Sequence, residues 1–189
     1  DTDEAWMATK LAGDATWFLP FNKGHNEGAG NPPNPNGHRT AYLWEEVFKP
    51  DSLAGIIQHF VLLEGKSTDP LAKKNLIFPR YHQLNVVRKL LAHTAAHGVG
   101  QSYLIQHSAG SGKSNSITWA AYQLIESYPE QADLPGAKAL DAPLFDSVIV
   151  VTDRRLLDKQ LRENIKDFSE VKNIVAPAMR SSDLRAALE

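Results

Sequence analysis

The amino-acid sequence predicts an α/β fold in which helices cover a parallel sheet, preceded by a small β/α segment. Two observations lead to this prediction. Strand-like and helix-like segments alternate from residue 102 onward, and the loop "HSAGSGKS" (107–114) joins the first of these strands to the next helix. Alternating strands and helices are typical of parallel sheets, because each helix returns the chain so that the next strand runs in the same direction.

The first 78 residues have the composition of short elements separated by loops. The expected order is two short strands within 5–21, a loop over 22–39, helices over 40–49 and 51–65, and a polar connector over 65–78. Gly13-Asp14 marks the turn between the strands, and Asp51 or Ser52 is the expected N-cap of the second helix. Because Gly, Asn and Pro dominate residues 22–39, this loop is either a flexible linker or a shaped functional loop. The aromatic residues Trp6, Trp17, Phe18 and Phe21 are expected in the core.

The second part of the chain carries the alternating pattern. The expected elements are a helix over 79–97, a strand over 102–106, a helix over 113–127, a connector over 128–146, a strand over 147–151 and a helix over 153–168. Leu84, Val87, Leu90 and Leu91 recur at helical spacing, and Gly98 supplies a stop. The run "SVIVV" (147–151) is β-branched at nearly every position, as in a strand buried on both faces.

Composition excludes several classes of protein. The 189-residue chain has a net charge of −2 and no cysteine, so disulfides and Cys-based zinc sites are excluded, and any nucleic-acid surface must be local. No apolar run approaches the ~20 residues that span a bilayer, so no membrane partner is expected. These features fit a cytoplasmic location. His59, His82, His93 and His97 are not expected to bind metal.

The loop at 107–114 has the properties of a phosphate-binding loop. Small residues let successive backbone N–H groups approach a phosphate, and the following helix adds the positive end of its dipole. Lys113 is expected to reach the β- and γ-phosphates of ATP, and the Ser114 hydroxyl to bind Mg²⁺. His107 occupies the position of the first glycine in the pattern G-x-x-x-x-G-K-[ST], and Gly110 lies inside the loop.

Three stretches together resemble a known family. "FPRYHQLNVVRKLL" (78–91), "YLIQHSAGSGKSNSITW" (103–119) and "SVIVVTDRRLLDKQL" (147–161) are very similar to the first motor lobe of the restriction subunit of type I restriction–modification enzymes, a superfamily 2 helicase-like DNA translocase. The resemblance also covers "RTAYLWEEVF" (39–48) and the N-terminal residues. It implies a RecA-like parallel sheet with flanking helices, present as an incomplete lobe.

The resemblance also implies roles for individual residues. Gln83 corresponds to the glutamine that recognises adenine, and Arg80 and Tyr81 beside it either border the base or pack against neighbouring residues. The loop contributes the remaining nucleotide contacts, namely Ala109, Gly110, Ser111, Gly112, Lys113 and Ser114, with Lys113 as the catalytic residue. Thr152, Arg154 and Arg155 correspond to a motif that contacts the DNA backbone.

The same resemblance divides the chain and names its partners. Residues 1–21 correspond to the end of a nuclease domain, 22–78 to linker loop and helices, and 79–189 to the first part of the motor lobe. The chain is expected to be a piece of a longer protein, inactive alone, without the acidic Walker B strand, the second lobe and the nuclease residues. The expected partners are double-stranded DNA and the methyltransferase and specificity subunits.

Two other functions stay open at this stage. One is a nucleotide-binding module that does not hydrolyse ATP. The other is a P-loop kinase for small molecules, in which Gln83 and the segment Thr152–Arg155 have no role.

Overall fold

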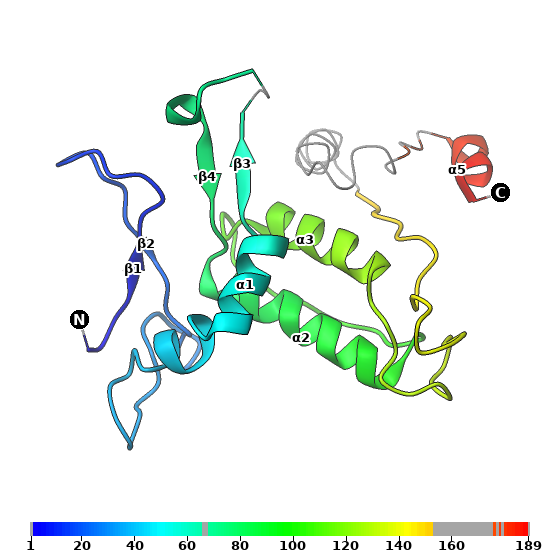
Figure 1. Cartoon of the computed structure of the whole chain (residues 1–189), viewed down its shortest axis with the longest axis horizontal. Helices are drawn as coiled ribbons and strands as arrows, with labels where there is room; N and C mark the ends of the chain where they lie inside the picture. Colours follow the sequence, from blue (N-terminus) through cyan, green and yellow to red (C-terminus); the bar gives the residue numbers. More distant parts are fainter. Residues whose placement is uncertain (1, 66–67, 153–175, 177, 179, 189) are drawn as a thin grey trace. The chain divides into compact units, whose positions relative to one another are not determined.

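The computed structural model describes residues 2–65, 68–152, 176, 178 and 180–188 (Figure 1). The chain forms two compact units, residues 1–85 and residues 86–189. Among the described residues, no helix has both the length and the apolar character needed to cross a membrane.

The first unit begins with a small antiparallel hairpin. Strand β1 (Trp6–Met7) pairs with β2 (Leu19–Pro20), which confirms the two short strands expected within 5–21. Phe21 is buried, but the side chains of Trp6, Trp17 and Phe18 are 54–78% exposed. The prediction that these three form core is therefore wrong, because two strands of two residues each offer no second layer against which to bury them.

A buried amide shapes the loop over residues 22–39. The side chain of Asn31 is 2% exposed, and its Oδ1 accepts a hydrogen bond from the Lys23 N–H at 2.8 Å. Its Nδ2 donates to the carbonyl of Asp3 at 2.9 Å and to Oδ1 of Asn22 at 2.8 Å. The loop is thus a shaped one, and the flexible-linker interpretation is not supported.

Helix α1 (Pro50–His59) follows a short π-helical turn (Leu43–Val47). It begins one residue before the predicted cap, with Lys49 as N-cap and no side-chain capping hydrogen bond. Proline favours this first position because its missing N–H would have no partner there. The hydroxyl of Ser52 donates instead to the carbonyl of Val47 at 2.9 Å.

The chain then forms a second hairpin that the sequence did not predict. Strand β3 (Leu62–Glu64) pairs antiparallel with β4 (Asn75–Ile77), and a 3-10 turn (Leu71–Lys73) lies between them. The predicted helix over 51–65 therefore ends early, and the predicted connector contains a strand.

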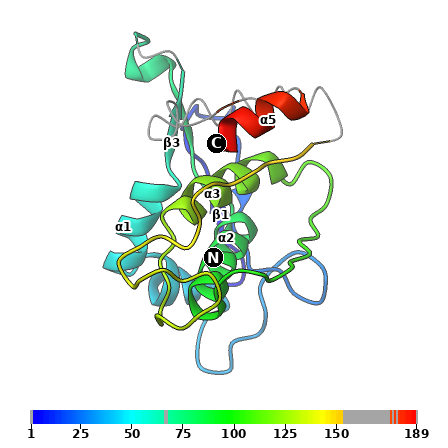
Figure 2. The ribbon, with the colours of Figure 1, turned by 90° about the vertical axis from the view of Figure 1, so that its right-hand side faces the viewer.

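Two helices of the second part were predicted well. Helix α2 (Tyr81–His97) starts in the first unit and ends in the second, and helix α3 (Lys113–Ile125) lies beside its second half (Figures 1 and 2). Trp119 of α3 is fully buried, and Val87 of α2 is 1% exposed. Gly98 ends α2 as expected, with φ +72° and its N–H donating to the Thr94 carbonyl at 2.8 Å.

The predicted parallel sheet is not present among the described residues, whose strands form two small antiparallel sheets in the first unit. Residues 102–106 and 147–151 adopt no strand, and Leu104 and Val151 are 94% and 86% exposed. A strand is stable only where neighbouring strands satisfy its N–H and C=O groups, and neither segment has such a neighbour in the described part of the chain.

The connector over 128–146 is irregular, as predicted, and folds back toward the end of α2 (Figure 2). Its Glu130 N–H donates to the carbonyl of Ala95, and the Val99 N–H donates to the carbonyl of Pro135. The helix predicted over 153–168 lies outside the described residues. A last helix, α5 (Ser181–Leu188), was not predicted, and Oδ2 of Asp183 caps it by accepting from the Arg180 N–H at 2.9 Å.

Candidate nucleotide-binding site

The loop before α3 leaves backbone N–H groups available to an anion. Gly110 and Gly112 have φ of +72° and +78°, a conformation that glycine adopts without steric cost. Gly112 is the N-cap of α3, and no side chain caps this helix end. The N–H groups of Lys113 and Ser114 make no hydrogen bond with any described residue. Free N–H groups at a helix N-terminus attract phosphate, because they are donors at the positive end of the helix dipole.

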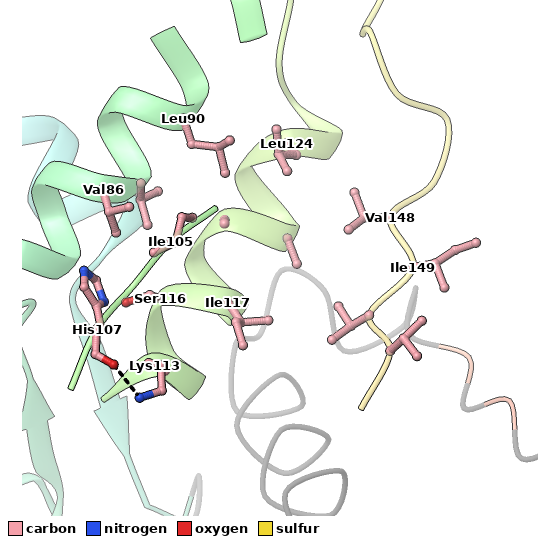
Figure 3. Close-up of a pocket in the computed structure, with 15 residues that line it drawn as sticks. Val86, Leu90, Ile105, His107, Lys113, Ser116, Ile117, Leu124, Val148 and Ile149 are labelled. Carbon is pink, nitrogen blue, oxygen red and sulfur yellow. Dashed lines mark hydrogen bonds between the residues drawn. The ribbon is translucent and has the colours of Figure 1, made fainter. Parts of the chain in front are cut away.

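The ammonium group of Lys113 lies on the same loop. Its Nζ donates to the carbonyl of His107 at 3.0 Å (Figure 3). It also donates to the carbonyl of Ser108 at 2.7 Å. A Cβ built on Gly110 would meet no atom within 4 Å, so there is open space beside the loop. A positive charge, free N–H donors and adjacent space together fit the phosphate groups of a nucleotide.

The backbone carbonyl and the side-chain hydroxyl of Ser114, the predicted magnesium ligand, differ in their hydrogen bonding. Its carbonyl accepts from the Thr118 hydroxyl at 3.0 Å, whereas its own hydroxyl makes no hydrogen bond with a described residue. Within the described ranges, no group of three or more His, Cys, Asp and Glu side chains is arranged to hold a metal. Mg²⁺ commonly takes few protein ligands and completes its shell with phosphate oxygens and water.

An apolar cavity of about 390 Å³ lies beside Lys113 in the second unit (Figure 3). From α3 it is lined by Lys113, Ser116, Ile117, Ala120, Ala121 and Leu124, which share one helix face. The hydroxyl of Ser116 is buried there without a hydrogen-bond partner in the described structure. The sequence analysis missed Ser116, although its position three residues after Lys113 places it on the same face.

Gln83 and Arg80 lie at the start of α2, in the first unit. The Gln83 side chain is buried, and its Oε1 accepts a hydrogen bond from the Arg80 N–H at 2.8 Å. This is the backbone contact that a Gln makes in the third position of a helix when it caps the N-terminus. The carbonyl oxygen therefore has a structural role, and adenine recognition by Gln83 stays a prediction.

Tyr81 packs in an aromatic cluster of the first unit. Its ring meets those of Tyr42 and Phe21 edge-on, with centroids 5.1 and 5.9 Å apart, and its hydroxyl is 3.4 Å from Oε2 of Glu46. The Tyr42 hydroxyl donates to the Phe21 carbonyl, and burial raises the pKa of Tyr42 to about 12. Of the two roles expected for Tyr81, packing is the one supported by these contacts.

Of the three predicted DNA contacts, Thr152 lies among the described residues. Thr152 is half-buried and follows the exposed Val151. Arg154 and Arg155 lie outside the described residues. The carbonyls of His107 and Ser108 hold the Lys113 ammonium beside the loop, and the predicted nucleotide and DNA contacts both stay predictions.

Comparison with known proteins identifies the family of this sequence. The model of the SWI2/SNF2 ATPase family matches residues 82–189, which is more than half of the chain and includes Gln83 and the whole phosphate loop. Searches of curated proteins and of solved structures gave no match. ATPase families use a nucleotide, usually with Mg²⁺, and the geometry around Lys113 and Ser114 fits both. The chain therefore belongs to the SWI2/SNF2 ATPase family and is an ATP-binding, helicase-like motor sequence.

Proposed function

We propose that the chain is the ATP-binding part of the DNA-translocating restriction subunit of a type I restriction–modification enzyme. The observation that carries nucleotide binding is the position of Lys113, whose ammonium group lies on a loop with free N–H donors at the N-terminus of α3. The restriction assignment rests on the joint sequence pattern of residues 78–91, 103–119 and 147–161.

The residues of this chain have distinct tasks in the proposed motor. The N–H groups of Lys113 and Ser114 bind phosphate, and the Lys113 ammonium leaves the carbonyls of His107 and Ser108 to neutralise phosphate charge. The Ser114 hydroxyl holds Mg²⁺. Hydrolysis of bound ATP supplies the free energy with which the complete motor moves DNA.

DNA and protein partners complete the proposal. Thr152, Arg154 and Arg155 contact the phosphate backbone of double-stranded DNA without reading its bases. The specificity and methyltransferase subunits select and mark the recognition site, and the nuclease domain of the restriction subunit cuts after translocation.

Replacing Lys113 by Ala tests the nucleotide role. In the complete restriction enzyme, we expect this variant to lose ATP-dependent translocation and cleavage, because the phosphate charge is no longer neutralised, while subunit assembly is retained. Lys89→Ala is the matched control, since Lys89 is an exposed lysine on α2 that does not line the cavity beside Lys113. ATPase rates and triplex displacement measure the two activities. Full ATPase activity in Lys113→Ala would exclude the assigned role.

Replacing both Arg154 and Arg155 by Ala tests the DNA role. Phosphate contacts release counterions, so the logarithm of the binding constant falls with the logarithm of salt concentration by about 0.9 per contact on duplex DNA. We expect a shallower salt slope and slower translocation in the double variant, with ATP binding nearly unchanged. Titrations of labelled duplex at several salt concentrations measure the slopes. Coincident slopes for variant and wild type would place the DNA track elsewhere.

A further inference from the structure

Two histidines on the last turns of α2 stack on each other. His93 and His97 are four residues apart, so they lie on the same face of the helix. Their ring centroids are 3.9 Å apart and the ring planes differ by 9°. Both side chains are exposed to solvent. Tyr103, after the end of the helix, meets the His93 ring edge-on at a centroid distance of 5.5 Å.

In each of the two rings, Nδ1 has a hydrogen-bond partner and Nε2 is available to a ligand. Nδ1 of His97 donates to the backbone carbonyl of His93 at 2.9 Å, and Nδ1 of His93 is hydrogen-bonded to the Tyr103 hydroxyl at 3.0 Å. Neither Nε2 atom makes a hydrogen bond with a described residue. Histidines that bind metal are usually held in this way, with one nitrogen bonded to a carbonyl or other polar group and the other bonded to the metal.

We propose that His93 and His97 form a binding site for a divalent transition metal ion of the Zn²⁺, Ni²⁺ and Cu²⁺ class, through their Nε2 atoms. Metal–nitrogen bonds of about 2.0–2.1 Å separate two ligand nitrogens by about 3.3 Å in a tetrahedral site. The ring centroids are 3.9 Å apart, and the nearly parallel rings must tilt toward each other before both Nε2 atoms point at one metal ion. Water fills the remaining positions of the metal.

The ligand set determines which ions bind. Imidazole suits Zn²⁺, Ni²⁺ and Cu²⁺, whereas Mg²⁺ and Ca²⁺ require oxygen ligands, which this pair does not offer. With two protein ligands, affinity follows the general order for nitrogen sites, so Cu²⁺ binds most tightly of the three. The proposal departs from the sequence-based expectation that His93 and His97 do not bind metal.

The site also links α2 to the chain that leads into the phosphate loop. The Tyr103 hydroxyl lies 3.4 Å from Oγ1 of Thr94 as well as 3.0 Å from His93. A metal that holds the His93 ring in place therefore also holds Tyr103 against the last turns of α2. Metal binding to the folded chain is then expected to raise its resistance to unfolding.

Titration of the chain with Cu²⁺ and Ni²⁺ tests the proposal. Electron paramagnetic resonance at substoichiometric Cu²⁺ is expected to show coupling to two imidazole nitrogens in the wild type and to one in His93→Gln or His97→Gln. Calorimetry with Ni²⁺ is expected to show at least a tenfold loss of affinity in either variant. Tyr103→Phe removes the partner of His93 Nδ1, and outer partners of this kind contribute about 10–100-fold to metal affinity.

His38→Gln is the matched control, because His38 is an exposed histidine whose ring makes no hydrogen bond or ring contact with a described residue. Wild-type affinity is expected in this variant. Equal Ni²⁺ affinity in wild type, His93→Gln and His97→Gln would overturn the proposal, and so would a wild-type chain that binds neither metal. Circular dichroism of each variant separates loss of ligands from loss of the helix.

Discussion

At the scale of single residues, Gln83 is expected to serve two purposes with one side chain. Its amide oxygen accepts from the Arg80 N–H at 2.8 Å, and this contact stabilises the first turn of α2. An amide also carries two N–H donors, and adenine presents both a donor and an acceptor at its edge. A substitution that removes the whole side chain therefore cannot separate capping from base recognition.

The variants Gln83→Ala and Gln83→Glu separate helix capping from base recognition. Alanine removes the cap and the amide, so we expect a loss of about 1 kcal/mol in the free energy of unfolding and a loss of about 1–3 kcal/mol in ATP binding, with less effect on GTP. Glutamate keeps the acceptor that caps α2 and removes the amide donors, so we expect the preference for ATP to narrow, while the buried charge adds its own cost to stability. Urea unfolding and nucleotide competition measure the two quantities. If Gln83→Glu leaves the ATP-to-GTP ratio unchanged, Gln83 serves capping alone.

At the scale of elements, the end of α2 depends on contact with the connector over 128–146. Gly98 has φ +72°, and a Cβ at this position would lie 2.3 Å from the carbonyl oxygen of Pro135. The neighbouring Val99 N–H donates to the same carbonyl at 2.8 Å. Glycine is thus required here for two reasons, a left-handed backbone and the close approach of another segment.

Replacing Gly98 by Ala should therefore cost more stability than replacing Gly100. Gly100 has φ +88° and open space around its missing Cβ, so Gly100→Ala measures the backbone term alone, about 1 kcal/mol. Gly98→Ala adds displacement of the connector, and we expect a total loss of about 2–4 kcal/mol. Urea unfolding of both variants gives the comparison. Equal losses would mean that Pro135 does not pack against Gly98 in solution.

At the scale of the whole molecule, the phosphate loop and its neighbouring cavity belong to one compact unit, residues 86–189. Ligand binding to a folded unit, and not to its unfolded chain, stabilises that unit by mass action. The segments 102–106 and 147–151, which form no strand, belong to the same unit. Nucleotide binding at the loop is therefore expected to raise the free energy of unfolding of this unit.

Mg²⁺–ATP at 100 times its dissociation constant is expected to raise the free energy of unfolding by about 2.7 kcal/mol. Lys113→Ala should abolish this gain, whereas Lys89→Ala should keep it. Urea titrations with and without nucleotide measure the difference. The same stabilisation in Lys113→Ala would show that nucleotide binds away from the loop.

The sequence by itself determined the features that depend on neighbouring residues. Helices α2 and α3, the stop at Gly98, the loop that ends in Lys113 and the hairpin β1–β2 follow from local spacing, turn residues and glycine conformation. Such signals act within a few residues. The match of residues 82–189 to an ATPase family covers most of α2, the loop and α3.

The tertiary structure alone decided the features that depend on distant partners. The apolar runs 102–106 and 147–151 have the composition of buried strands, yet strand formation requires neighbouring strands, and the described chain supplies none. Asn31 shapes its loop through contacts with Asp3 and Asn22, and the residues next to Asn31 in the sequence do not predict these contacts. The available Nε2 atoms of His93 and His97 likewise depend on Tyr103, because a hydrogen bond from outside the helix orients the first ring.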